Sequence, residues 1–129
     1  MVLLGGILLV PHHWITTNDV TTGLSKEYPN LQPRVYTASP DLVFGIAHEC
    51  IGTMRRWKLV TEDKKAHRLE AEVRTFLFGF TDDVTVTIRP ESGGSRVIVR
   101  SHSRVGKGDI GENARTIRAL QSEMDRRLR

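Results

Sequence analysis

Alternation of apolar and polar residues in the second half of the chain most narrows the folds that this sequence can adopt. Three stretches show it, at residues 69–75, 84–89 and 96–105. Because successive side chains of a strand point to opposite faces, each stretch is predicted to be a strand with one buried and one solvated face. A shorter strand is expected at 57–61, and turn-forming residues gather at 63–65, 81–83 and 90–94. The pattern therefore predicts four antiparallel strands.

The alternation changes phase at Phe76. Phe76, Phe78 and Phe80 would follow the second strand on the face that Glu70 and Glu72 occupy. One explanation is a β-bulge that returns the three rings to the core. The other is an outward aromatic stripe, which would make the three rings a contact surface. The sequence leaves both explanations open.

Two segments have the spacing of amphipathic helices. The first follows Ser39, a typical capping residue, and Pro40, which suits the first helical position, and it is predicted to end near Met54. Its apolar stripe consists of Val43, Ile46, Ala47, Cys50, Ile51 and Met54. The second is predicted to start at Asp109, which would form a capping box with Glu112. Its apolar stripe consists of Ile110, Ala114, Ile117, Leu120, Met124 and Leu128.

The order helix, four antiparallel strands, helix predicts a two-layer α+β domain at residues 39–129, with both helices on one face of the sheet. The face of the last strand that carries valines also carries Ser101 and Ser103, and it is expected to meet the helices. The two serines are small enough to let a helix approach closely. The opposite face is left charged.

An extended connector is predicted at residues 15–38, because this segment has no helical or strand period and contains two prolines. Tyr28, Leu31 and Tyr36 are expected to attach it to the domain surface.

The arm at residues 1–14 begins with ten almost wholly apolar residues. As a helix they would span about 15 Å, roughly half the hydrocarbon core of a bilayer. A secretory signal is a poor match, because no basic start precedes the apolar run and Pro11 follows it. The arm is therefore the end of a membrane segment, a half-inserted anchor, or an apolar arm that packs on another subunit. The residues expected to contact a membrane or partner are Leu3, Leu4, Ile7, Leu8, Leu9 and Trp14.

The net charge of +4 comes mostly from residues after Ile88. Such an excess fits an anionic partner, and it fits mere solubility equally well. The single cysteine, Cys50, cannot form an internal disulfide, and its place on the apolar side of the first helix predicts a buried small hydrophobe.

The stretch from Arg100 to Asn113 gathers hydrogen-bond donors. Arg100 and Arg104 offer forked guanidinium groups, Ser103 a hydroxyl, and the backbone around Gly106 free amides near a helix start. Together they are a candidate site for phosphate or carboxylate.

An internal role for the same residues is the alternative. Asp82 and Asp83 would then bind the two arginines, and the glycines would only complete the turn from strand to helix. Asp109 at the helix cap would also occupy amides that a ligand needs.

Other chemistries find little support. Neighbouring residues on a strand face opposite sides, so His102 cannot serve Ser101 or Ser103 as a base. The five histidines have no metal-ligand spacing, and no phosphate loop or nucleotide fingerprint is present. Basic residues are not gathered with exposed aromatics as nucleic-acid binding requires. We therefore predict no catalytic residue, no metal, no cofactor and no nucleic-acid partner, and the sequence identifies no small-molecule substrate.

From Tyr36 onward the chain resembles the bacterial domain-of-unknown-function 1499 family. The resemblance rests on the segment 79–84 (GFTDDV) and on the pattern RS-x-SR-x-G-x-x-D-x-G-x-N that begins at Arg100. Segments 18–22 and 28–29 resemble the connector of longer members, some of which carry membrane-spanning helices before it. The resemblance supplies no reaction.

Two functions follow as expectations. The first is a non-catalytic accessory subunit, peripheral to a membrane, whose apolar arm attaches it to membrane protein subunits or lipid, for example in a respiratory or photosynthetic complex. The second is a soluble module that binds an anion or a lipid headgroup.

Overall fold

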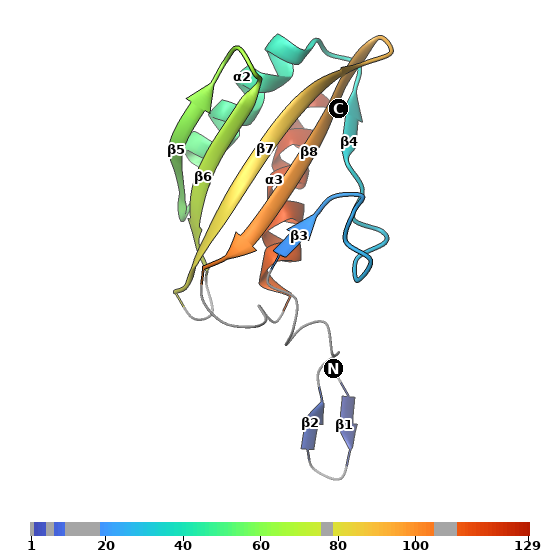
Figure 1. Ribbon diagram of the computed structural model, residues 1–129, viewed down its shortest axis with the longest axis vertical. Helices are drawn as coiled ribbons and strands as arrows, with labels where there is room; N and C mark the ends of the chain where they lie inside the picture. The colour runs from blue at the N-terminus through green and yellow to red at the C-terminus, as the bar shows by residue number, and fades with distance from the viewer. Residues whose placement is uncertain (1, 5–6, 10–18, 76–78, 105–110) are drawn as a thin grey trace.

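The computed structural model describes residues 2–4, 7–9, 19–75, 79–104 and 111–129, and its centre is a six-stranded antiparallel sheet with two helices on one side (Figure 1). The strands of this sheet lie in the order β3-β8-β7-β6-β5, and β4 pairs with β8 beside β3. The elements are β3 (Asp19–Thr21), β4 (Arg34–Tyr36), α2 (Pro40–Thr53), β5 (Trp57–Asp63), β6 (Arg68–Arg74), β7 (Thr81–Glu91), β8 (Gly94–Ser103) and α3 (Glu112–Leu128). The predicted α+β class is confirmed.

The sheet is larger than the four strands predicted, because the connector adds β3 and β4. Both pair antiparallel with β8, β3 opposite residues 100–102 and β4 opposite residues 95–97. Each has only three residues, too few to show a period of two. Between them Tyr28 and Leu31 are buried in the core, so the connector is part of the domain's packing.

The predicted turn at 81–83 is wrong. Strand β6 ends at Arg74, and the chain turns between Thr75 and Phe80. The Thr75 amide donates to the Phe80 carbonyl at 2.7 Å, and the Phe80 amide to Thr75 Oγ1 at 3.0 Å. Residues 81–83 instead open β7, opposite the end of β8. Adjacent aspartates favour turns in water, but here Asp82 is buried and accepts hydrogen bonds from hydroxyl groups.

The predicted loop at 90–94 is also shorter than expected. Strand β7 continues to Glu91 and β8 starts at Gly94, so only Ser92 and Gly93 form the turn. Gly93 has φ +72°, a conformation that a residue without a side chain adopts at little cost.

Helix α2 forms as predicted. The Ser39 hydroxyl caps it by accepting a hydrogen bond from the Leu42 amide at 3.3 Å. The helix begins at Pro40 and ends at Thr53. Its buried side chains are Val43, Phe44, Ala47, Cys50 and Ile51.

Helix α3 begins later than predicted. Glu112 is its first residue, and Gly111 before it has φ +80° and makes no side-chain cap. The predicted capping box between Asp109 and Glu112 is therefore wrong, since Glu112 opens the helix instead of lying in its third position. Asp109 and Ile110 lie outside the described residues.

The core fills the space between the helices and one face of the sheet. The valine-bearing face of β8 is buried as predicted, and it includes Ser101 and Ser103. Helix α3 contributes Ala114, Ile117, Leu120 and Met124, each almost fully buried. The opposite face of the sheet carries ion pairs.

The apolar start of the chain forms a separate two-stranded ladder, β1 (Val2–Leu4) with β2 (Ile7–Leu9), paired antiparallel so that Val2 lies opposite Leu9. Among the described residues, no helix combines the length and the apolar character needed to cross a membrane. Trp14 lies outside them.

Candidate functional site

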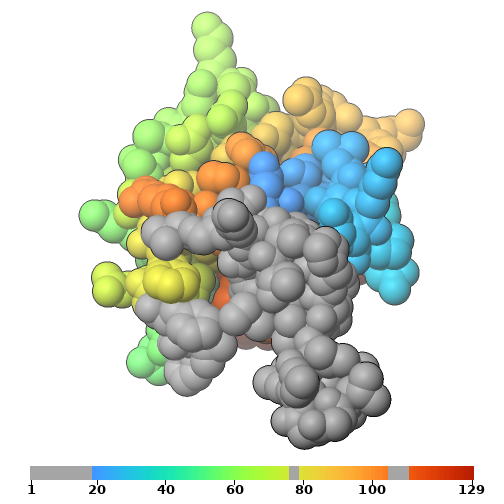
Figure 2. All heavy atoms as spheres, turned by 60° about the horizontal axis from the view of Figure 1, so that its bottom comes forward, coloured from blue at the N-terminus to red at the C-terminus, as the bar shows by residue number. Residues whose placement is uncertain are grey.

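The two arginines of the predicted anion site already bind carboxylates of the chain. Arg100 forms a forked pair with Asp19, at 2.9 and 2.6 Å. Strand β3, which carries Asp19, lies against the end of β8 (Figure 2). Arg104 forks onto Asp83 at 2.9 and 2.7 Å and also reaches Glu72 at 2.7 Å.

These pairs change the acidity of the carboxyl groups. The hydrogen bond from Arg104 holds the pKa of Asp83 below its usual value, and Arg100 does the same for the pKa of Asp19. Both arginines are about half exposed, so water screens the pairs strongly. Arg104 thus binds Asp83, as expected if these arginines have an internal role. The partner of Arg100 is Asp19 and not Asp82, the other aspartate expected to bind these arginines.

Ser103 lies on the other face of β8, in a buried polar cluster. Its hydroxyl donates to Asp82 Oδ1 at 2.9 Å and accepts from Asn113 Nδ2 at 2.9 Å. Asn113 Oδ1 accepts the Ser101 hydroxyl at 2.5 Å, and the Thr116 hydroxyl lies 3.5 Å from Asp82 Oδ2. The cluster joins α3 to β7 and β8. Gly106 lies outside the described residues.

The predicted aromatic contact surface is described in part. Phe80 lies after the turn and is 44% exposed, next to the first residue of β7. Phe76 and Phe78 lie outside the described residues. The two explanations, a β-bulge and an outward stripe, concern these residues and therefore stay predictions.

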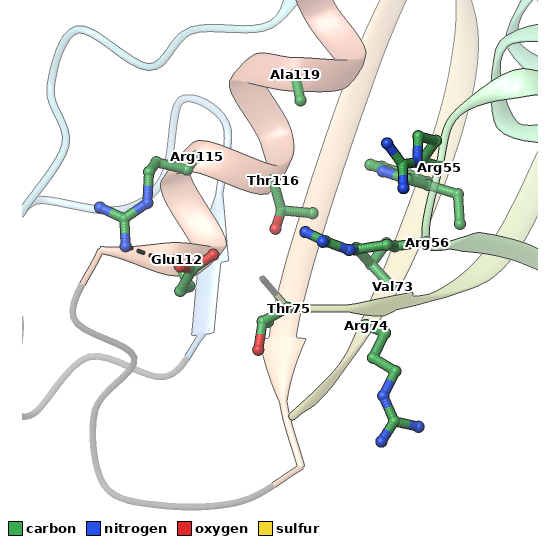
Figure 3. A pocket seen from close by; sticks show the side chains of 10 residues that line it. Arg55, Arg56, Val73, Arg74, Thr75, Glu112, Arg115, Thr116 and Ala119 are labelled. Carbon is green, nitrogen blue, oxygen red and sulfur yellow. Dashed lines mark ion pairs between the residues drawn. The ribbon is translucent and has the colours of Figure 1, made fainter. Parts of the chain in front are cut away.

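A pocket of about 170 Å³ lies where the α2–β5 link, the end of β6 and the start of α3 meet (Figure 3). Four of the residues that line it are arginines from these three places: Arg55, Arg56, Arg74 and Arg115. The remaining lining residues are Trp57, Val73, Thr75, Glu112, Thr116 and Ala119.

The link between α2 and β5 positions two of the arginines. Arg56 has φ +72°, an uncommon conformation for a residue with a side chain. Its carbonyl accepts the Arg74 amide at 2.9 Å, which fastens the link to the end of β6. In Figure 3 the Arg56 guanidinium extends toward Thr116 and Thr75.

The pocket combines exposed cations with buried hydroxyl groups. Thr75 and Thr116 are 6% and 7% exposed, whereas all four arginines are exposed. Arg115 pairs with Glu112 at 3.1 Å. Among the described residues, no carboxylate lies within ion-pair distance of Arg55 or Arg74. The pocket thus has cationic groups that the described part of the chain does not neutralise.

Sequence reasoning missed this pocket. Its arginines are spread over residues 55–115, and only the pairing of β5 with β6 and the packing of α3 bring them together. The adjacent Arg55 and Arg56, directly after a helix and before Trp57, were the available signal.

Fold and pocket together define a two-layer α+β domain with an arginine-lined surface pocket. The match of a family model over residues 10–124 adds the family: the chain belongs to a family of proteins of unknown function, DUF1499. The match includes the connector, in agreement with the two strands that it adds to the sheet.

No curated protein matches the sequence. Among solved structures, TTHA0849 from Thermus thermophilus has 12% identity and a TM-score of 0.45, over 85% of this chain and 96% of that one. CV1439 from Chromobacterium violaceum has 11% identity and a TM-score of 0.48, over 87% and 98%. Ara h 8.0201 has 9% identity and a TM-score of 0.46, over 84% and 97%.

Proposed function

We propose that this domain is a binding module for a compact anion, held in the pocket between the α2–β5 link, β6 and α3. The observation that carries the proposal is that arginines from three separate elements line one hollow, with the guanidinium of Arg56 directed into it (Figure 3). Guanidinium groups match the oxygens of phosphate and carboxylate in geometry and charge. Thr75 and Thr116 belong to the wall of the same pocket, where the Thr75 hydroxyl accepts the Phe80 amide and the Thr116 hydroxyl lies against Asp82.

The size of the pocket limits the ligand. At about 30 Å³ per water, 170 Å³ corresponds to five or six water molecules. Pockets for drug-sized ligands are larger, about 300–1,000 Å³. The ligand is therefore a small oxyanion, or the anionic end of a larger molecule that stays outside the pocket.

A titration with inorganic phosphate at low salt tests the proposal. We expect the double variant Arg55→Gln/Arg56→Gln to bind at least tenfold more weakly than the wild type, because two of the cationic groups are lost. Arg89→Gln, which removes an exposed cation from β7, is the matched control and should bind like the wild type. Equal affinity for the double variant and the wild type would remove the site.

Arg104→Gln separates this pocket from the site at the end of β8. Because Arg104 already binds Asp83 and Glu72, its loss should leave phosphate affinity unchanged. A loss confined to Arg104→Gln would instead favour the site in 100–106.

A second candidate function is attachment through the arm. We propose that residues 1–14 attach the domain, as a non-catalytic accessory subunit, to a membrane protein assembly or to lipid. The pairing of the apolar segments 2–4 and 7–9 with each other, and not with the six-stranded sheet, favours this role. If a chain without residues 1–14 still fractionates with membranes, the arm is not the attachment.

A further inference from the structure

Glu112 is the one carboxylate among the described residues that line the arginine pocket. It is the first residue of α3, and its side chain is only 16% exposed. Its Oε1 lies 3.1 Å from Arg115 Nη2. The carboxylate is thus part of the pocket wall, at the place where an anion would bind.

A carboxylate in an anion site has a definite chemical consequence. When ionised it only accepts hydrogen bonds, and it has about four lone-pair directions, of which Arg115 uses one. A ligand oxygen next to Glu112 must therefore bring a proton to donate. An anion without a proton meets repulsion between two negative charges in a partly desolvated pocket instead.

We propose that Glu112 makes the pocket selective for an oxyanion that carries a proton, such as inorganic phosphate or a phosphomonoester, over one that carries none, such as sulfate. The inference rests on the proposed anion-binding function and names its ligand class. Hydrogen phosphate and sulfate have the same tetrahedral shape and the same charge, so the arginines and threonines alone discriminate little between them. The proton on hydrogen phosphate is the difference that Glu112 detects.

The test is a pair of calorimetric titrations of the full chain at pH 8 and low salt, where hydrogen phosphate is the main phosphate species, one with sodium phosphate and one with sodium sulfate. We expect the wild type to prefer phosphate at least tenfold, which corresponds to about 1.4 kcal/mol. In Glu112→Gln the preference should fall close to one, because an amide can donate to sulfate as well as accept from phosphate. Glu27→Gln makes the same change of charge at an exposed position outside the pocket, and it should keep the wild-type preference.

The outcomes separate the two proposals. If the wild type binds neither anion, both the anion-binding function and the selectivity are overturned. If it binds both equally, or if Glu112→Gln keeps the preference for phosphate, the pocket stands and the role of Glu112 is overturned. Should Glu112→Gln lose its far-ultraviolet circular dichroism signal, Glu112→Ser takes its place. That variant also lacks the carboxylate, so it should lose the preference for phosphate, and a retained preference would contradict the role.

Discussion

Replacing Asn113 with alanine tests whether the polar cluster between α3 and β8 stabilises the fold. Asn113 is fully buried, and its amide group binds two serine hydroxyls, that of Ser101 at 2.5 Å and that of Ser103 at 2.9 Å. Within the described part of the chain, Asn113→Ala leaves the Ser101 hydroxyl without a hydrogen-bond partner, whereas Ser103 keeps its bond to Asp82.

The expected cost follows from these bonds. A buried group left without a partner costs about 1–3 kcal/mol, and one further hydrogen bond contributes about 1 kcal/mol. Asn113→Ala should therefore lower the free energy of unfolding by about 3 kcal/mol. For a domain of this size that corresponds to a fall in Tm of about 10 °C.

Urea unfolding followed by circular dichroism measures the effect. Asn30→Ala, at an exposed position, is the control and should change stability by less than about 0.5 kcal/mol. Adding Ser101→Ala to Asn113→Ala removes the unpaired hydroxyl. The double variant should therefore lose about 1 kcal/mol less unfolding free energy than the two single variants lose in sum. Strict additivity, or an Asn113→Ala variant as stable as Asn30→Ala, would refute the reasoning.

Further predictions concern the Arg104–Asp83 ion pair, the phenol of Tyr36 and the core. Arg104 lowers the pKa of Asp83, so the pair stabilises the fold above the unfolded-state pKa of Asp83. This stabilisation is lost as the pH falls through the lower folded-state pKa. Carbon NMR should find that Arg104→Gln raises the pKa of Asp83. Tyr36→Phe removes the hydrogen bond from the phenol to Asp125 at 2.7 Å and should cost about 1 kcal/mol in urea unfolding. Burial and that same bond raise the pKa of Tyr36, so ultraviolet titration should find this phenol still protonated where free tyrosine ionises. Leu120→Ala empties a fully buried position and should cost about 2–5 kcal/mol, and a cost below 1 kcal/mol would contradict the assigned core.

The long, regular elements could be predicted from the sequence, because burial on one face leaves a period in it. Helix α2 follows from Ser39, Pro40 and its apolar stripe, and β6 and β8 follow from their alternation. These signals are local, so a single sequence carries them in full.

Features that depend on distant partners could not be predicted. The three residues of β3 become a strand only because β8 supplies an edge for them. In the sequence Asp82 has the character of a turn residue. It is buried in a strand because the hydroxyls of Ser103 and Thr116, which are distant in sequence, bind its carboxylate. Similarly, Asp19 cannot be predicted as the partner of Arg100 from a connector that is expected to lie outside the sheet.

The buried cluster gives a physical meaning to the pattern on which the family resemblance rests. Ser101, Ser103 and Asn113 from that pattern hold the start of α3 against β8. Glu112 and Thr116 lie on the same turns of α3, so this anchoring also sets their position in the arginine pocket. The motif residues therefore support the wall of the pocket for which we propose anion binding, although most of the arginines that line this pocket lie outside the motif.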